Sequence, residues 1–113
     1  MTKSEKSQTD SLLLGFTTVE TREQAEALAG ESVERRLAAC AQVDAPIRSF
    51  FFWQGRGEQA DEIRVLFKFV ASRREAMAAW IAERHPYDTP EWIVVAPQET
   101  SEKYLQWARE VSI

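Results

Sequence analysis

The segment RHPYDTPEW, residues 84–92, brings together side chains that could hold a metal ion. It contains His85, the one histidine of the chain, and the carboxylates of Asp88 and Glu91. An imidazole with carboxylates suits a borderline divalent metal. Prolines at positions 86 and 90 disfavour helix for the residues before them, so a helix should end at Arg84 and an extended, stiff loop should follow. The second interpretation is therefore a rigid connector between a helix and a strand.

Two further residues could carry chemistry. Cys40, the single cysteine, stands where a helix gives way to a strand, and it is either an inert buried thiol or a thiolate ligand or redox-sensitive group. Lys68 lies within an apolar strand, where a lysine either protects an edge and extends to water or meets an anion in a cleft. A nucleophile pair of Cys40 and His85 would have no third group to orient it, and the common catalytic motifs are absent. We therefore do not expect an enzyme.

Composition excludes several classes of function. The 113 residues fit one domain, and a net charge of −4 gives no basic surface for nucleic acid. No apolar run approaches the ~18 residues of a membrane span. A single cysteine and a single histidine permit neither an intrachain disulfide nor a four-ligand Cys/His zinc site within one subunit. Residues 1–10 have no apolar signal core, so we expect a disordered tail, a single domain over 11–113 and a cytoplasmic location.

The pattern along the chain predicts four strands and three helices. A Thr21/Gln24 capping box and apolar residues at helical spacing indicate the first helix, and a Ser72/Glu75 box indicates the second. Two glycines in QGRGEQAD, residues 54–61, indicate a hairpin turn, and Pro46 should interrupt the strand before it. The expected strands are 11–19, 38–53 with the break near Pro46, 62–70 and 92–97; the expected helices are 21–36, 73–84 and a short one striped by Tyr104, Trp107, Ala108 and Val111.

This order of elements predicts an α+β fold of the ferredoxin-like βαββαβ kind, with an antiparallel sheet, both main helices on one face and an extra C-terminal helix. In the strand over 62–70, alternation places Ile63, Val65, Phe67 and Phe69 on one face. The opposite face carries Leu66, Lys68 and Val70, and nothing in one chain covers it. Uncovered apolar area usually means association.

The run FFFW, residues 50–53, supports the same expectation, because it places aromatic side chains on both faces of one strand. We interpret it as a strand buried twice, once by its own chain and once by a neighbouring subunit. Phe51, Phe52 and Trp53 are therefore the expected subunit contacts, and the expected state is a homotrimer.

The chain resembles the CutA family of divalent-cation tolerance proteins over nearly all of residues 12–112. The resemblance rests on RLAAC (36–40), FFWQG (51–55), HPYDTPEW (85–92) and YLQW (104–107). It implies a ferredoxin-like fold, a compact homotrimer built like the PII signalling proteins, a cytoplasmic location and a link to tolerance of copper and other divalent cations.

The resemblance also implies site residues. In some bacterial members the proposed copper ligands are a cysteine ending the first strand and two successive histidines before Pro-Tyr. Here His85 matches the second histidine, Arg84 stands in place of the first, and there is no cysteine near Phe16 and Thr17. At most weak binding of copper or another divalent cation is therefore expected, with His85 as the ligand of any bound metal and Cys40 as a weaker candidate.

Two alternatives remain beside the metal-responsive trimer. One is a PII-like sensor, in which a cleft between subunits holds a small anionic metabolite near Lys68, Tyr87, Asp88 and Glu91. The other is a trimeric scaffold that acts through contacts with partner proteins.

Overall fold

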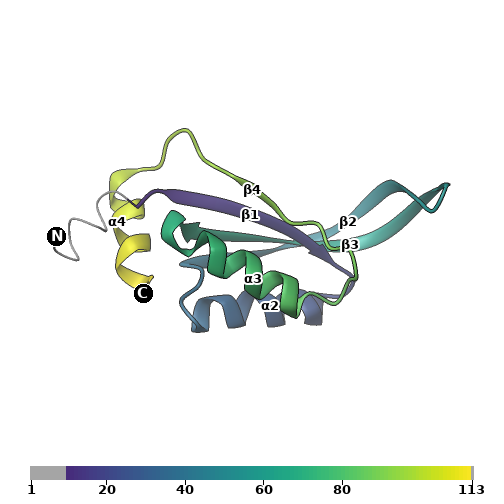
Figure 1. Ribbon diagram of the computed structural model, residues 1–113, viewed down its shortest axis with the longest axis horizontal. Helices are drawn as coiled ribbons and strands as arrows, with labels where there is room; N and C mark the ends of the chain where they lie inside the picture. Colours follow the sequence, from purple (N-terminus) through teal and green to yellow (C-terminus); the bar gives the residue numbers. More distant parts are fainter. Residues whose placement is uncertain (1–9, 113) are drawn as a thin grey trace.

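The computed structural model describes residues 10–112, so most of the expected N-terminal tail lies outside the described residues. The sheet has the order β2-β3-β1-β4 and every neighbouring pair is antiparallel. Helices α2 and α3 lie on one face of the sheet (Figure 1). The predicted ferredoxin-like fold with an extra C-terminal helix is confirmed. Its elements are β1 (Leu12–Val19), α2 (Arg22–Glu34), β2 (Cys40–Trp53), β3 (Arg56–Val70), a 3-10 turn (Ala71–Arg73), α3 (Arg74–Arg84), β4 (Ile93–Val95) and α4 (Glu102–Val111).

The core forms between the helices and one face of the sheet. The alternation predicted for β3 is confirmed, because Ile63, Val65, Phe67 and Phe69 are all buried. Phe67 meets Trp80 of α3 edge to face, with ring centroids 6.2 Å apart. This packing holds the helices against the sheet from which the site described below is built.

Of the two predicted helix capping boxes, the structure contains the first but not the second. The Thr21/Gln24 capping box is present, and each side chain accepts a hydrogen bond from the other residue's backbone N–H. The second box is wrong, because α3 has no side-chain cap and the Ser72 hydroxyl and N–H both bond to Asp10. Asp10 also accepts a hydrogen bond from Arg109 of α4 at its carbonyl, 2.8 Å away. The expected tail therefore does not include Asp10, which joins α4 to the start of α3.

The second and third strands form a long hairpin that projects from the body of the molecule (Figure 1). The predicted turn over residues 54–61 is wrong, since only Gln54 and Gly55 separate the strands and Arg56 already pairs with Trp53. Both turn residues have positive φ, as two-residue hairpin turns of the primed type require. The residues that follow belong to the paired strand β3, and they can be polar because the arm is exposed to solvent. We call residues 47–62 the arm; it begins just beyond the irregularity between Val43 and Pro46, where the expected interruption is confirmed.

The last strand is shorter than expected, Ile93–Val95 instead of residues 92–97. It pairs with β1 only from Phe16 to Leu14, and Pro97 cannot donate to a ladder. Ile93 and Val95 are 52% and 41% exposed on this edge strand. The sheet therefore keeps an apolar, incompletely covered edge.

Helix α4 covers only one end of the sheet face opposite α2 and α3. Its Ala108 packs with Leu12, Ala39 and Val70 in a second, smaller apolar cluster. The remainder of this face, which we call the open face, carries Leu14, Phe16 and Leu66, all half-buried. The predicted uncovered face is thus present, apart from the part under α4. Among residues 10–112, no helix is long and apolar enough to cross a membrane.

Candidate functional site

The loop between α3 and β4 is fixed to the sheet through His85. This side chain is 8% exposed, and its Nε2 lies 2.9 Å from Thr17 Oγ1 and 3.0 Å from the carbonyl oxygen of Thr18. Its Nδ1 accepts a hydrogen bond from the Tyr87 backbone N–H at 3.0 Å. Because Nδ1 accepts and a carbonyl can only accept, Nε2 carries the proton. Both ring nitrogens are therefore occupied within the chain.

The same loop makes two further polar contacts. The Thr17 hydroxyl donates to the carbonyl oxygen of Glu91 at 2.7 Å, and the Tyr87 hydroxyl donates to Glu62 Oε2 at 2.9 Å. Glu62 lies at the base of the arm, where it pairs with Ile47. The loop thus connects the middle of the sheet with the point from which the arm projects.

Burial sets the ionisation of the two rings in this network. Loss of hydration lowers the pKa of His85 from its usual 6.5, although the Thr18 carbonyl and the Glu62 charge act in the opposite direction. Burial, the hydrogen bond to Glu62 and the nearby carboxylates raise the pKa of Tyr87. At neutral pH the imidazole is therefore uncharged and the phenol keeps its proton.

The far end of the loop is anchored by Trp92, which packs against Gly15 of β1. A Cβ placed on Gly15 would lie 2.4 Å from Trp92 Cη2 and 3.0 Å from Phe69 Cε1, so only glycine leaves room for the indole. The indole stacks on Phe69 and meets Phe67 edge to face. Sequence reasoning missed this contact, although an isolated glycine within a strand was an available signal of close approach.

Arg84, which the resemblance aligns with a histidine of some family members, takes part in a different structure. Its Nε donates to Glu31 Oε2 at 3.1 Å, and the same oxygen accepts from Trp80 Nε1 at 3.2 Å. Arg35 contacts this carboxylate oxygen as well, at 2.7 Å. The Trp80 hydrogen bond is the largest of the causes that lower the pKa of Glu31. Position 84 therefore helps to join α2 to α3, which sequence reasoning did not anticipate.

The predicted metal ligands do not converge within one chain. Cys40 pairs with Lys68, which in turn pairs with Leu14, so Cys40 belongs to the open face. Alternation places Thr17 on the opposite face of the sheet, and its partner His85 lies there too. Asp88 and Glu91 are exposed. Within residues 10–112 no three His, Cys, Asp or Glu side chains are grouped to hold a metal ion. The residues that the structure describes therefore do not fit a copper site within a single chain.

The predicted anion-binding residues are likewise separated. Lys68 lies six residues along β3 from Glu62, the partner of Tyr87, which is about 20 Å at strand spacing. Its Nζ sits 5.4 Å from the centre of the Tyr104 ring, a favourable cation–π distance. A cleft that includes both Lys68 and Tyr87 would therefore have to combine two subunits.

The buried histidine predicts a specific loss of stability in acid. The folded chain keeps His85 neutral, whereas the unfolded chain takes up a proton below about pH 6.5. The free energy of unfolding should therefore be constant above about pH 6.5 as far as this group is concerned, and should fall as the pH decreases below it. Denaturant midpoints at about pH 7.5 and about pH 5 measure this effect, since these values bracket the ordinary imidazole pKa.

The matched variant for this measurement is His85→Gln, which does not titrate. Its midpoint should change less between the two pH values than that of the wild type. Glu31 does not interfere, because its lowered pKa affects stability only below its usual value of 4.5. An equal shift in both proteins would show that His85 is not the group that senses acid.

The fold and the loop define a class: a small ferredoxin-like domain with a projecting two-stranded arm and a histidine-anchored loop at its base. A family model described as "CutA1 divalent ion tolerance protein" matches residues 13–111. The chain belongs to this family.

Individual relatives agree with the family match. A "Divalent-cation tolerance protein CutA" from Pectobacterium atrosepticum is 37% identical over 83 residues, which cover 74% of this chain and 76% of the relative. The structure of CutA from Synechococcus elongatus PCC7942 is 37% identical, with a TM-score of 0.85 over 90% of this chain and 89% of that one. A structure from Archaeoglobus fulgidus, described as a periplasmic divalent cation tolerance protein, is 28% identical with a TM-score of 0.84, over 88% and 97% of the two chains.

Proposed function

We propose that this chain acts in divalent-cation tolerance as a homotrimer, and that its working surfaces form only when subunits assemble. The observation that carries the proposal is the aromatic run at the end of β2. Phe50, Phe51, Phe52 and Trp53 are 72%, 44%, 79% and 50% exposed in the single chain. Four adjacent aromatic residues in water are unfavourable, and large exposed apolar patches mark interaction sites.

The two edges of the sheet support assembly as well. Strands β2 and β4 are both edge strands, and each has an unpaired row of backbone groups. Natural proteins protect such edges because they pair readily with other chains. Pairing of β2 with β4 of a neighbouring copy would remove both edges and cover Ile93 and Val95.

The loop geometry limits how metal could take part. A metal on His85 would have to displace either the Tyr87 N–H from Nδ1 or the proton that Nε2 shares with Thr17 and Thr18. Binding of copper or another divalent cation should therefore be weak and should involve donors from a second copy. Asp88 and Glu91 are exposed on the loop and are available for such a role.

A second function is favoured by Lys68. This ammonium lies on the open face beside Cys40, held over Tyr104, and forms no ion pair within residues 10–112. A neighbouring subunit that closed over this face would create a cleft with a cation in it. A small anionic metabolite is the ligand that such a cleft would favour, as in the PII-like alternative. The scaffold alternative and the cytoplasmic location remain predictions.

Calorimetric titration with a copper(II) salt tests the metal proposal. Wild type should bind weakly at about pH 7.5 and at about pH 5.5, because an imidazole must be neutral to bind metal and burial lowers the pKa of His85 below its usual 6.5. His85→Ala should abolish the binding. Thr17→Val, which removes one partner of Nε2 at nearly constant shape, should strengthen it.

The remaining outcomes separate the alternatives. Tight binding, or equal binding by wild type and His85→Ala, would show that the metal sits elsewhere. Absence of binding in every variant would contradict the metal role and favour the anion-binding trimer, which a thermal-shift screen of anionic metabolites would then test.

A further inference from the structure

The arm joins the body of the molecule at an irregular point in the sheet. The pairing of β2 with β3 is interrupted between Val43 and Pro46, and such an irregularity bends the strand that contains it. Strand β1 ends at Val19, which pairs with Ile63, and β4 pairs only with residues 14–16 of β1. Beyond Ile63 the two strands of the arm therefore have only each other, and their pairing does not fix the direction in which the arm projects.

Side chains from the body of the molecule contact the base of the arm. Tyr87 of the loop donates its hydroxyl to Glu62 Oε2 at 2.9 Å. Around the irregularity, Arg22 of α2 donates to the Asp44 carbonyl at 3.3 Å, and Arg64 lies 3.9 Å from the Asp44 carboxylate. The Asp44 contacts are long and exposed, and exposed ion pairs contribute little. Tyr87 and Glu62 are half-buried, so water competes less for their hydrogen bond.

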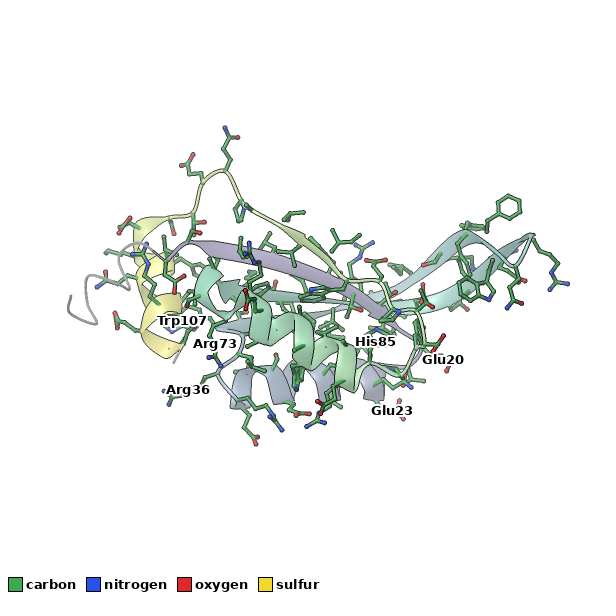
Figure 2. The ribbon with its side chains drawn as sticks, in the orientation of Figure 1. Glu20, Glu23, Arg36, Arg73, His85 and Trp107 are labelled. Carbon is green, nitrogen blue, oxygen red and sulfur yellow. The ribbon has the colours of Figure 1, made fainter. Side chains whose placement is uncertain are left out.

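The backbone of the same tyrosine is tied to His85. The Tyr87 N–H donates to His85 Nδ1 at 3.0 Å, and the centroids of the two rings lie 4.9 Å apart. Pro86 stands between the two residues, and its fixed φ leaves this short segment little freedom. His85 Nε2 is held in turn by Thr17 and Thr18 of β1. Figure 2 shows His85 at the end of the body from which the arm projects.

These contacts form one continuous series from the sheet to the arm. The series runs from β1 through His85 to Tyr87 and then to Glu62. Glu62 pairs with Ile47, so it lies where the arm begins. A tyrosine whose only role was to close the loop could leave its hydroxyl in water, as the exposed neighbour Asp88 does with its carboxylate. The Tyr87 hydroxyl instead reaches the strand that forms the base of the arm.

We propose that Tyr87 is a positioning residue that couples His85 to the arm. With its N–H on Nδ1 and its hydroxyl on Glu62, Tyr87 holds the arm in the direction that Figure 1 shows. A ligand on Nδ1 displaces the N–H, and the displaced tyrosine then releases Glu62 and lets the arm turn about the irregularity. Coupling between two sites is reciprocal, so a change at Glu62 should also be felt at His85. The ligand-binding end of this inference rests on the proposed function, whereas the contacts themselves lie within one chain.

The distance between two spin labels tests the arm end of the coupling. In a Cys40→Ser background, Arg56→Cys carries a label near the tip of the arm and Glu34→Cys carries one on α2, both at exposed positions. Dilution with unlabelled protein restricts the measured pairs to one chain, whatever the oligomeric state. Tyr87→Phe, which removes only the hydroxyl, should shift and broaden the distribution of distances. Tyr104→Phe removes the same group from α4 and should leave the distribution unchanged.

The single histidine makes the other end of the coupling readable by nitrogen NMR of protein without a histidine tag. Wild type should show one imidazole, with Nδ1 as a hydrogen-bond acceptor. Glu62→Met removes the acceptor of the Tyr87 hydroxyl at similar size, and it should shift the Nδ1 signal toward that of a nitrogen without a hydrogen bond. Glu62→Gln keeps an acceptor oxygen and should restore most of the wild-type signal.

Each negative result has its own meaning. An unchanged distance distribution in Tyr87→Phe would show that other contacts set the direction of the arm, and it would overturn the proposal. An unchanged Nδ1 signal in Glu62→Met would overturn it as well, because the two ends would not be coupled. Equal shifts in Glu62→Met and Glu62→Gln would mean that His85 senses the charge of Glu62 and not the hydrogen bond, which also contradicts the proposal. These measurements need neither metal nor a trimer, so such failures are separate from a failure of the proposed function.

Discussion

Replacing Gly15 by alanine should destabilise the folded chain by about 1–3 kcal/mol, the usual cost of adding a methyl group to a filled core. The new Cβ would lie 2.4 Å from Trp92 Cη2, a distance that no real pair of carbon atoms keeps. The indole cannot simply move aside, because it is packed between Phe67 and Phe69. The clash must therefore shift Trp92, and with it the loop that His85 anchors. Thermal unfolding followed by circular dichroism measures the change as a fall of several degrees in Tm.

Gly30→Ala is the matched control for this experiment. Gly30 lies inside α2, and a Cβ there would meet no atom within 4 Å. Alanine should therefore stabilise the helix by about 0.5–1 kcal/mol relative to glycine. The two substitutions add the same methyl group and should change Tm in opposite directions. If Gly15→Ala and Gly30→Ala both lowered Tm, or if neither did, the packing of Trp92 against Gly15 would not be as close as described.

Truncation of Trp53 to alanine should weaken assembly by about 2–4 kcal/mol per interface, the typical range for an aromatic anchor. Trp53 lies at the end of β2, 50% exposed, and its backbone pairs with Arg56 across the turn. The truncation removes apolar area that the single chain leaves in water. The fold of the isolated subunit should therefore be little affected, while the trimer should dissociate at higher protein concentration than the wild type.

Arg48→Ala provides the control for Trp53→Ala. Arg48 is also on the arm, but its guanidinium bonds to Asp61 and Gln59 of its own hairpin, in exposed positions. Exposed ion pairs contribute little, so this variant should dissociate like the wild type. If wild type, Trp53→Ala and Arg48→Ala all dissociated at the same concentration, Trp53 would not be an interface anchor.

The parts of the fold that could be predicted from the sequence depend on local rules. Alternation in β3 has a fixed period of two, so the buried face followed directly from Ile63, Val65, Phe67 and Phe69. The end of α3 at Arg84 followed from the proline at position 86, because proline restricts the residue before it. The uncovered apolar face could be predicted because both main helices were expected on one face of the sheet, which leaves the other face without cover.

The errors came from segments in which tertiary contacts override composition. The sequence QGRGEQAD has the composition of a loop, yet most of it is strand. Backbone pairing holds the exposed arm together, so its strands need no alternation of apolar residues. Ser72 has the spacing of a helix cap, but Asp10 takes its hydrogen bonds. In both cases the partner lies outside the window that local rules consider.

The site was beyond sequence reasoning for the same reason. His85 and Thr17 are 68 residues apart, and no pattern in either segment pairs them. The nitrogen atoms that seemed free for a metal are occupied by partners from β1 and from the loop itself. The sequence singled out these side-chain types as a group, but their hydrogen-bond partners decide what they can bind.

The central claim is that this chain works as a homotrimer whose exposed aromatic arm is buried between copies. Its most direct test is the mass of the purified wild-type protein in solution, measured by light scattering over a range of micromolar concentrations. We expect a stable species of about three times the chain mass of 13.0 kDa at every concentration. A species that stays near 13.0 kDa throughout would contradict it, because the arm and the sheet edges would then be exposed in the working protein.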